Sequence, residues 1–357
     1  MMKTGYWKFG IVAILLFSVQ WLRGADYKYA GSFLELGIGA RAMGMGGAYV
    51  SVANDGSAFY WNPAGVSTLL RPEVFGMYAS LFKSLEKHHH IGFTRPLYGA
   101  TAISLNWIRL SVTDIPRYSS ANFDPNDPTG YWRRIEESTN AETWQELKNL
   151  GTVLTDDPLG FSNFVNDAFI LTLAKLYKID LDFGWQYFIL PVEIPLGVNI
   201  KFLRQSLFNQ SASGLGFDIG SMLKFGLDDL FDNNSLGKLA FGIAVKDIWN
   251  TKITWNTASR QSNKIKHSWH LGASYFQPIS SINSQLLFSY AYEHKYKNVH
   301  HFGMEYVYYE RIAVRFGVDN KQFTAGIGLR IMLFNLDYAF RGHDLGGSHR
   351  ISLSVRL

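Results

Sequence analysis

The sequence has 357 residues, a formal net charge of +5, 15% aromatic side chains and no cysteine. The lack of cysteine excludes disulfide bonds, thiolate metal sites and cysteine catalysis. Residues 1–25 hold three basic side chains and no acidic one, so the remainder carries 31 basic against 29 acidic residues. This near balance gives no basis for nucleic-acid binding.

Residues 1–25 have the layout of a signal peptide. Lys3 and Lys8 precede an apolar run over residues 9–19, and the small residues Gly24-Ala25 follow at the exit. The run is roughly half the ~20 residues that a transmembrane helix needs. No later segment is long and apolar enough to be such a helix, so insertion into a membrane would require strands.

Residues 31–70 are rich in glycine and alanine and carry few charges. Gly37-x-Gly39-x-x-Ala42 matches part of a dinucleotide-binding fingerprint, but no alternating strand–helix pattern follows it. Glycines at such density instead indicate tight turns and close backbone packing in a narrow space. We therefore expect residues 26–70 to form a plug, or hatch, inside a barrel. The expected hatch turns are at Gly39, Gly44, Gly46 and Gly47.

From residue 71 onward, short segments alternate apolar side chains with polar or small ones. In residues 215–225, for example, Leu215 and Phe217 alternate with Gly216 and Asp218. A period of two is typical of strands. In a soluble β-protein the apolar set would face a core, whereas in a membrane barrel it faces lipid and the lumen holds charges and small residues. The glycine-rich opposite face and the aromatic ends of the segments favour the membrane barrel.

The alternating segments number about 14, or 16 if residues 180–195 contain a further hairpin; an even number places both termini in the periplasm. The predicted fold is therefore all-β: an antiparallel transmembrane barrel of about 14 strands over residues 71–357. Strand parity places the long insert 111–163 on the extracellular side, and so long an insert is typically functional. Its aromatic side chains form either an outward capture site or the insert's own small core. These are Phe123, Tyr131, Trp132 and Trp144.

Arg41 is the one charged side chain in the central part of the expected plug. Buried charges are usually paired, so we expect Arg41 to contact a carboxylate on the inward face of the wall. The candidate carboxylates are Asp218, Glu293, Glu305 and Asp337.

Other chemistries have weaker signals. Alternate residues of a strand point to opposite faces, so His88, His89 and His90 cannot converge on one metal ion. The carboxylates of residues 111–163 lack the spacing of a calcium loop, and no nucleophile, base and orienting acid stand together in the sequence. We expect no metal, no cofactor and no enzymatic activity.

Two N-terminal stretches carry a family resemblance: GARA at 39–42 leading to GGA at 46–48, and YWNPAG at 60–65. With later stretches, they make the chain similar to the PorV/PorQ group of outer-membrane proteins, which are related to FadL-type long-chain fatty-acid transporters. The resemblance implies a 14-stranded barrel with an N-terminal hatch, whose motif is Asn62, Pro63 and Ala64. The later stretches are GVNIK at 197–201, FDIG at 217–220, LDYAF at 336–340 and SHRIS at 348–352.

The resemblance leaves two functions open. FadL-like members pass hydrophobic small molecules across the outer membrane through a hatch that shifts. PorV-like members serve the type IX secretion system and dock secreted proteins. We expect an integral protein of the bacterial outer membrane, in contact with its lipid, whose partner is a hydrophobic small molecule or a secreted protein. A soluble secreted β-protein is the third possibility.

Overall fold

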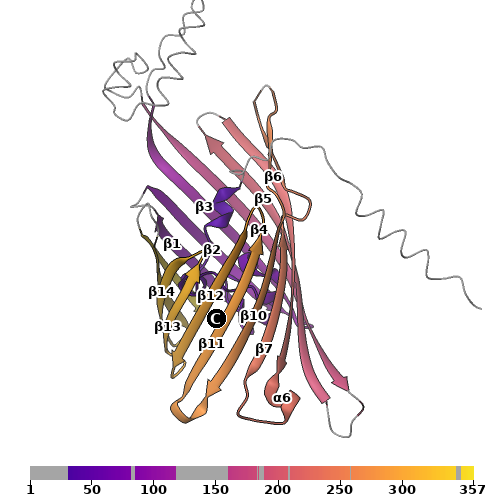
Figure 1. Cartoon of the computed structure of the whole chain (residues 1–357). Coiled ribbons are helices and arrows are strands. Elements are labelled where there is room, and N and C mark those ends of the chain that lie inside the picture. The colour runs from indigo at the N-terminus through magenta and orange to yellow at the C-terminus, as the bar shows by residue number, and fades with distance from the viewer. Residues whose placement is uncertain are drawn as a thin grey trace, which may run out of the picture.

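The structure, a computed structural model, describes residues 31–81, 85–117, 160–182, 184, 189–207, 210–257, 259–342 and 347–357. The expected signal peptide lies outside the described residues. So do most of the long insert and its four aromatic residues, and these expectations remain predictions. Figure 1 shows a tall barrel of tilted strands with the short helices of the N-terminal part between them.

One antiparallel sheet closes on itself to form the wall of the barrel. The wall strands are β1 (Glu73–Leu81), β2 (Glu86–Leu97), β3 (Thr101–Arg117), β4 (Gly160–Asp182), β5 (Ile189–Leu207), β6 (Gln210–Gly226), β7 (Lys238–Lys246), β10 (Ser268–Ile279), β11 (Ser284–His294), β12 (Asn298–Tyr308), β13 (Ile312–Asp319), β14 (Gln322–Ile331), β15 (Phe334–Arg341) and β16 (Ser348–Arg356). The first strand pairs with the last, and β5 pairs with both β4 and β6, so the ring is closed.

The strand count resolves the choice between 14 and 16. Sixteen strands belong to the sheet, but β8 (Lys252–Trp255) and β9 (Ser262–Lys264) form a hairpin attached to β6, which leaves fourteen in the wall. The predicted 14-stranded antiparallel barrel is thus confirmed. The further hairpin considered for residues 180–195 does not form, because β4 and β5 pair without interruption down to Asp182 and Ile189.

The alternating side chains are oriented as a membrane barrel requires. Ile243 and Leu353 on the outer face are 39% and 44% exposed, whereas Arg315 and Asp337 on the inner face are 3% and 2% exposed. The outward residues of β4 between Asp167 and Lys175 are all apolar, over about 26 Å of strand. Because the strands of such barrels tilt by about 35–45°, this length spans roughly 20 Å along the membrane normal, which approaches the ~25 Å apolar band of an outer-membrane barrel. The chain is therefore an integral outer-membrane protein.

The two ends of the barrel differ in the length of their connections. At one end the strands are joined by short turns at residues 98–100, 309–311 and 332–333. At the other end lie the long connections 118–159 and 247–267. Outer-membrane barrels have short periplasmic turns and long extracellular loops, so the end with the long connections faces outward.

Tyrosine and histidine side chains mark the outer membrane boundary. Tyr290 and Tyr338 each share a hydrogen bond with the Nδ1 atom of a histidine on the next strand, His300 at 2.9 Å and His349 at 2.8 Å. Rings that are apolar on their faces and polar at one end are favoured where lipid meets water. These pairs form part of the aromatic girdle that the sequence predicts.

Residues 31–70, hereafter the inner segment, lie inside the wall. They form only short helices: η1 (Ser32–Glu35), α2 (Ala40–Gly44), α3 (Ala58–Trp61) and η2 (Pro63–Thr68). Two more short helices, α6 (Leu227–Phe231) and η3 (Ser280–Ile282), lie in periplasmic connections. Of the described helices, none has the length and apolar character needed to cross a bilayer. Ile38, Tyr49 and Phe59 are completely buried, so the core lies where the inner segment meets the wall.

Glycines in the wall strands allow the inner segment to pack closely against the wall. A Cβ atom at Gly242 would lie 2.5 Å from the carbonyl oxygen of Val50 and 2.9 Å from the Cα atom of Ser51. Both are backbone atoms of the inner segment, so neither can swing aside. At Gly76, a Cβ atom would have its nearest neighbour at 3.8 Å. Gly242 therefore sets how closely the inner segment approaches β7.

We expect Gly242→Ala to lower the free energy of unfolding by about 2 kcal/mol, because an overfilled contact costs about 1–3 kcal/mol. Gly76→Ala is the matched control, and its unfolding midpoint should stay the same or rise slightly, since alanine restricts the unfolded chain. Denaturant unfolding of the purified barrel, followed by tryptophan fluorescence, measures both. Equal midpoints for the two variants would contradict a tight contact at Gly242.

Candidate functional site

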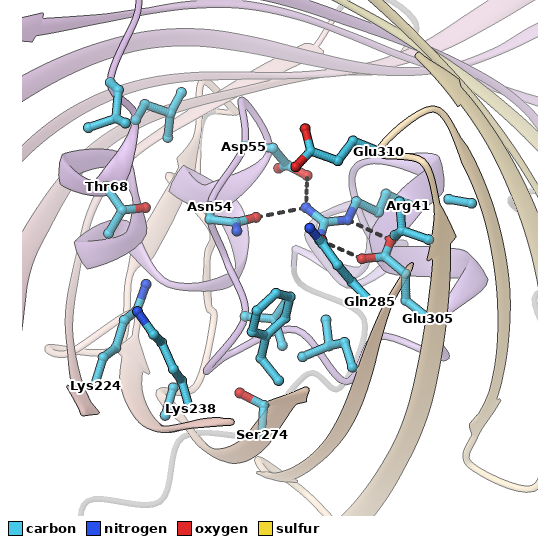
Figure 2. A pocket seen from close by; sticks show the side chains of 18 of the residues that line it. Arg41, Asn54, Asp55, Thr68, Lys224, Lys238, Ser274, Gln285, Glu305 and Glu310 are labelled. Carbon is cyan, nitrogen blue, oxygen red and sulfur yellow. Dashed lines mark hydrogen bonds and ion pairs between the residues drawn. The ribbon is translucent and has the colours of Figure 1, made fainter. Parts of the chain in front are cut away.

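The inner segment lies between two cavities in the lumen. The outer cavity has a volume of about 190 Å³ and is lined by α3 of the inner segment and by the extracellular halves of wall strands. The inner cavity, of about 960 Å³, lies on the periplasmic side and is lined by residues 51–55 and 68–71 together with the periplasmic ends of the strands. Figure 2 shows part of the inner cavity, with Arg41 at its edge.

Arg41 joins the inner segment to the wall. Its Nε and Nη2 atoms donate to the two carboxylate oxygens of Glu305 at 2.9 and 2.7 Å, and its Nη1 atom donates to Asn54 at 2.7 Å (Figure 2). Burial lowers the pKa of Arg41, but Glu305, together with Tyr49 and Asp55, outweighs this effect and holds the pKa well above its ordinary value. The guanidinium is therefore a permanent charge that needs Glu305.

The network continues into the wall. Arg315 donates to Glu305 at 2.5 Å and to Asp337 at 2.7 Å, and each of these three side chains is at most 5% exposed. Glu305 thus lies between a cation of the inner segment and a cation of β13. A carboxylate shared in this way binds the two parts of the protein strongly, because its removal would leave two buried cations together.

The other candidate carboxylates have different partners. Asp218 contacts Lys201 at 2.7 Å, and Lys201 also contacts Asp247 at 2.8 Å. Glu293 lies near two histidines, and Asp337 reaches Arg315 rather than Arg41. Of the four candidate carboxylates, Glu305 is therefore the one that the structure places beside Arg41. Ion pairs within the wall were not predicted, although Lys and Arg at inward positions of the alternating segments could have indicated them.

The Asn62-Pro63-Ala64 stretch fixes a turn of the inner segment. Asn62 is completely buried; its amide nitrogen donates to the carbonyl oxygens of Val50 at 2.9 Å and of Ser221 in β6 at 3.0 Å. Its side-chain oxygen accepts from the backbone N–H of Ala64, which caps the helix that begins at Pro63. The motif thus anchors the inner segment to the wall.

Three of the four expected turn glycines have left-handed backbones: Gly39, Gly46 and Gly47, with φ of 87°, 65° and 76°. Gly44 is different. It lies in α2, where a Cβ atom would come within 3.1 Å of the Cα atom of Gly326. Gly44 therefore serves close packing against β14 rather than a turn.

The outer cavity combines aromatic rings with charges. Phe59, Tyr60 and Trp61 of α3 all line it, and the Nζ atom of Lys246 lies 4.1 Å from the centre of the Tyr60 ring. An ammonium group over an aromatic face is attracted by the ring. These aromatic and charged residues were not predicted from the sequence to form a site. The cavity lies between inner segment and wall, as a solute-binding cavity would, but it is not apolar throughout.

The inner cavity has a mixed lining of apolar and charged side chains. Its wide volume and its charges favour hydration of this space. Cationic side chains outnumber carboxylates along its periplasmic rim. The cations are Arg71, Lys224, Lys238, Arg311, Arg330 and Arg356, and the carboxylates are Glu73, Glu193, Asp229 and Glu310.

The histidine run behaves as strand geometry requires. His88 and His90 are buried on the inner face, and His89 lies on the outer face. Within the described ranges, no group of three or more histidine and carboxylate side chains is arranged to hold a metal ion.

No family model matches the chain, and no curated protein matches it. Among solved structures, it resembles the Pseudomonas putida toluene transporter TodX, with a TM-score of 0.44 and 10% identity over 89% of this chain and 96% of that one. It resembles a Pseudomonas aeruginosa FadL homologue with a TM-score of 0.42 and 10% identity, over 88% and 97% of the two chains. A third is the CymD monoaromatic hydrocarbon channel, with a TM-score of 0.37 and 9% identity, over 90% and 98%. The resemblance to the PorV/PorQ group stays a prediction.

Proposed function

We propose that this barrel passes hydrophobic small molecules across the outer membrane and that the inner segment is the hatch that closes it. The observation that carries the proposal is the place of the inner segment between the outer and inner cavities. A solute that entered from outside would meet the inner segment and could continue only if it shifted. The inner segment is held by the apolar core and by hydrogen bonds and ion pairs to the wall, and water can replace the polar contacts when the segment moves.

The outer cavity supports a cargo with an apolar body and at least one polar group. Tyr60 and Trp61 offer ring faces for stacking. Lys246 and Glu293 in the same cavity offer a cation and a carboxylate for the polar group. A purely aliphatic solute would displace water from these charges and offer them no hydrogen bond in return, at a cost in free energy. The inner cavity would then provide the exit.

The secretion alternative rests on a docking surface in the outward loops. Its candidate residues in 111–163 lie mostly outside the described residues. No observation on the described residues favours that function over transport, so it stays a prediction from the resemblance.

Binding of a small aromatic alcohol to the detergent-purified barrel, measured by equilibrium dialysis, tests the proposal. We expect Trp61→Ala to weaken binding about tenfold, because a stacking face and its buried area are lost. Trp249→Ala is the matched control, since Trp249 is 76% exposed and makes an edge-to-face contact with the outward-facing Phe217. If both variants bind as the unmodified protein does, the outer cavity does not receive the solute.

A further inference from the structure

A second site lies on the outer surface of the wall, where four neighbouring strands place polar side chains side by side at the lipid boundary. His89 of β2 pairs with Arg109 of β3, Arg109 with Asp167 of β4, and Asp167 with Arg204 of β5. All four residues alternate with buried inward residues, so they point away from the lumen. We call these four residues the boundary row.

Asp167 holds Arg109 in a fixed orientation. The Nε and Nη2 atoms of Arg109 donate to the two carboxylate oxygens of Asp167 at 2.7 and 2.9 Å, and the indole N–H of Trp107 donates to the same carboxylate at 2.8 Å. The guanidinium lies over the Trp107 ring at 4.9 Å. Among ion pairs of the described residues, this is the one in which both side chains point outward.

The row carries an excess of positive charge. Asp167 is only 8% exposed and already accepts three hydrogen bonds. The Nη1 atom of Arg109 and the whole guanidinium of exposed Arg204 have no partner among the described residues. One step further toward the outside, Lys87 is also exposed. Three cations therefore surround one satisfied carboxylate, and free guanidinium N–H groups match phosphate oxygens well.

An apolar groove continues directly below the row, toward the membrane centre. It has a volume of about 550 Å³ and is lined by Ile91, Trp107, Phe169 and Phe202, which follow the boundary row on the same four strands. A second groove of about 580 Å³ lies elsewhere on the outer surface of the barrel, and neither groove has a cationic residue in its own lining. The first groove differs in lying directly below the boundary row, which joins a cationic rim to an acyl-sized channel.

We propose that this surface binds a phosphorylated, multiply acylated glycolipid of the outer leaflet, of the lipid A class. Its phosphate lies on Arg109, Arg204 and Lys87, and one acyl chain lies in the groove. The charge excess selects the phosphate, and the continuity of row and groove selects a ligand that is both anionic and acylated. The site is on the outer face of the wall and does not depend on transport through the lumen.

Native mass spectrometry of the full-length barrel in detergent tests this site, with bisphosphorylated lipid A and its phosphate-free form as probes. We expect the phosphorylated lipid to bind at least tenfold more tightly. Arg204→Gln and Lys87→Gln should each weaken that binding about tenfold, because each removes a charge-assisted contact. Neither side chain makes a hydrogen bond or an ion pair with the described residues, so both variants should fold. Arg109 is not substituted, because its loss would leave the Asp167 carboxylate without a cationic partner at the lipid boundary.

Lys175→Gln is the matched charge control. Lys175 also points outward and is exposed, but it lies near the periplasmic boundary of β4. Ile200→Trp, which fills the first groove, should weaken binding, whereas Met304→Trp in the second groove should not. The site is disproved if the phosphate-free lipid binds equally well, if Arg204→Gln behaves like Lys175→Gln, or if cross-linking shows that this face instead pairs with a second barrel.

Discussion

Uptake of a labelled aromatic alcohol should stop when the inner segment is covalently fixed to the wall. The chain has no cysteine, so a pair can be introduced without interference. Ala40 at the start of α2 donates its backbone N–H to the hydroxyl of Ser352 in β16 at 3.1 Å, and both residues are buried. This proximity is compatible with the short Cα separation that a disulfide requires. We expect oxidised Ala40→Cys/Ser352→Cys to reduce uptake to the level of cells without the barrel.

Reduction should restore uptake, because the two cysteines are small and leave the other contacts intact. The single variants Ala40→Cys and Ser352→Cys are the controls and should transport under both conditions. The measurement is uptake by Gram-negative cells that lack their own channels for the solute, with bond formation verified by mass spectrometry. Normal uptake by a fully cross-linked barrel would show that the inner segment does not have to leave β16.

Glu305→Gln should release the inner segment without unfolding the wall. The substitution leaves the buried guanidiniums of Arg41 and Arg315 without their shared carboxylate, and breaking a buried pair costs about 3–5 kcal/mol. We expect amide hydrogen exchange in residues 40–48 to accelerate at least 100-fold, since exchange from local opening follows the opening free energy. Exchange in β3 and β4 should not change.

Glu193→Gln is the matched control for this experiment. Glu193 contacts Lys178 at 3.0 Å, but these side chains are 40% and 69% exposed, and such pairs are worth about 0–1 kcal/mol. In the Glu193→Gln variant, the exchange rates of residues 40–48 should therefore stay within about fivefold of those of the unmodified protein. If Glu305→Gln and Glu193→Gln give the same exchange in residues 40–48, the Arg41–Glu305 pair does not hold the inner segment in place.

The wall was predictable from sequence because the surroundings of each strand determine the residue pattern of that strand itself. Lipid on one side and a packed lumen on the other impose a period of two, as in residues 215–225. Residues 180–195, which the sequence left open as a further hairpin, instead contain the ends of β4 (Gly160–Asp182) and β5 (Ile189–Leu207). Strands that extend beyond the bilayer meet water on their outer face, so the alternation there is no longer required.

The partner of Arg41 could not be chosen from sequence alone. Glu305 is 264 positions away, and its selection depends on the path of the inner segment and on the register of the wall strands. The boundary row was missed for a different reason. Arg109 and Asp167 occupy outward positions that are otherwise apolar in their strands. In the sequence, a polar residue at such a position indicates that the strand has ended. Only the pairing of β3 with β4 shows that the two charges meet.

The inner segment precedes the wall strands in the chain, and this order constrains how the protein is assembled. The segment contacts the hydroxyl of Ser352 in the last strand, and on the other side of the ring it contacts the backbone carbonyl of Ser221 and the hydroxyl of Ser289. Because the segment is held from several sides of the ring, we expect the sheet to curl around it during insertion. The seam between β1 and β16 would then close after the inner segment is in place.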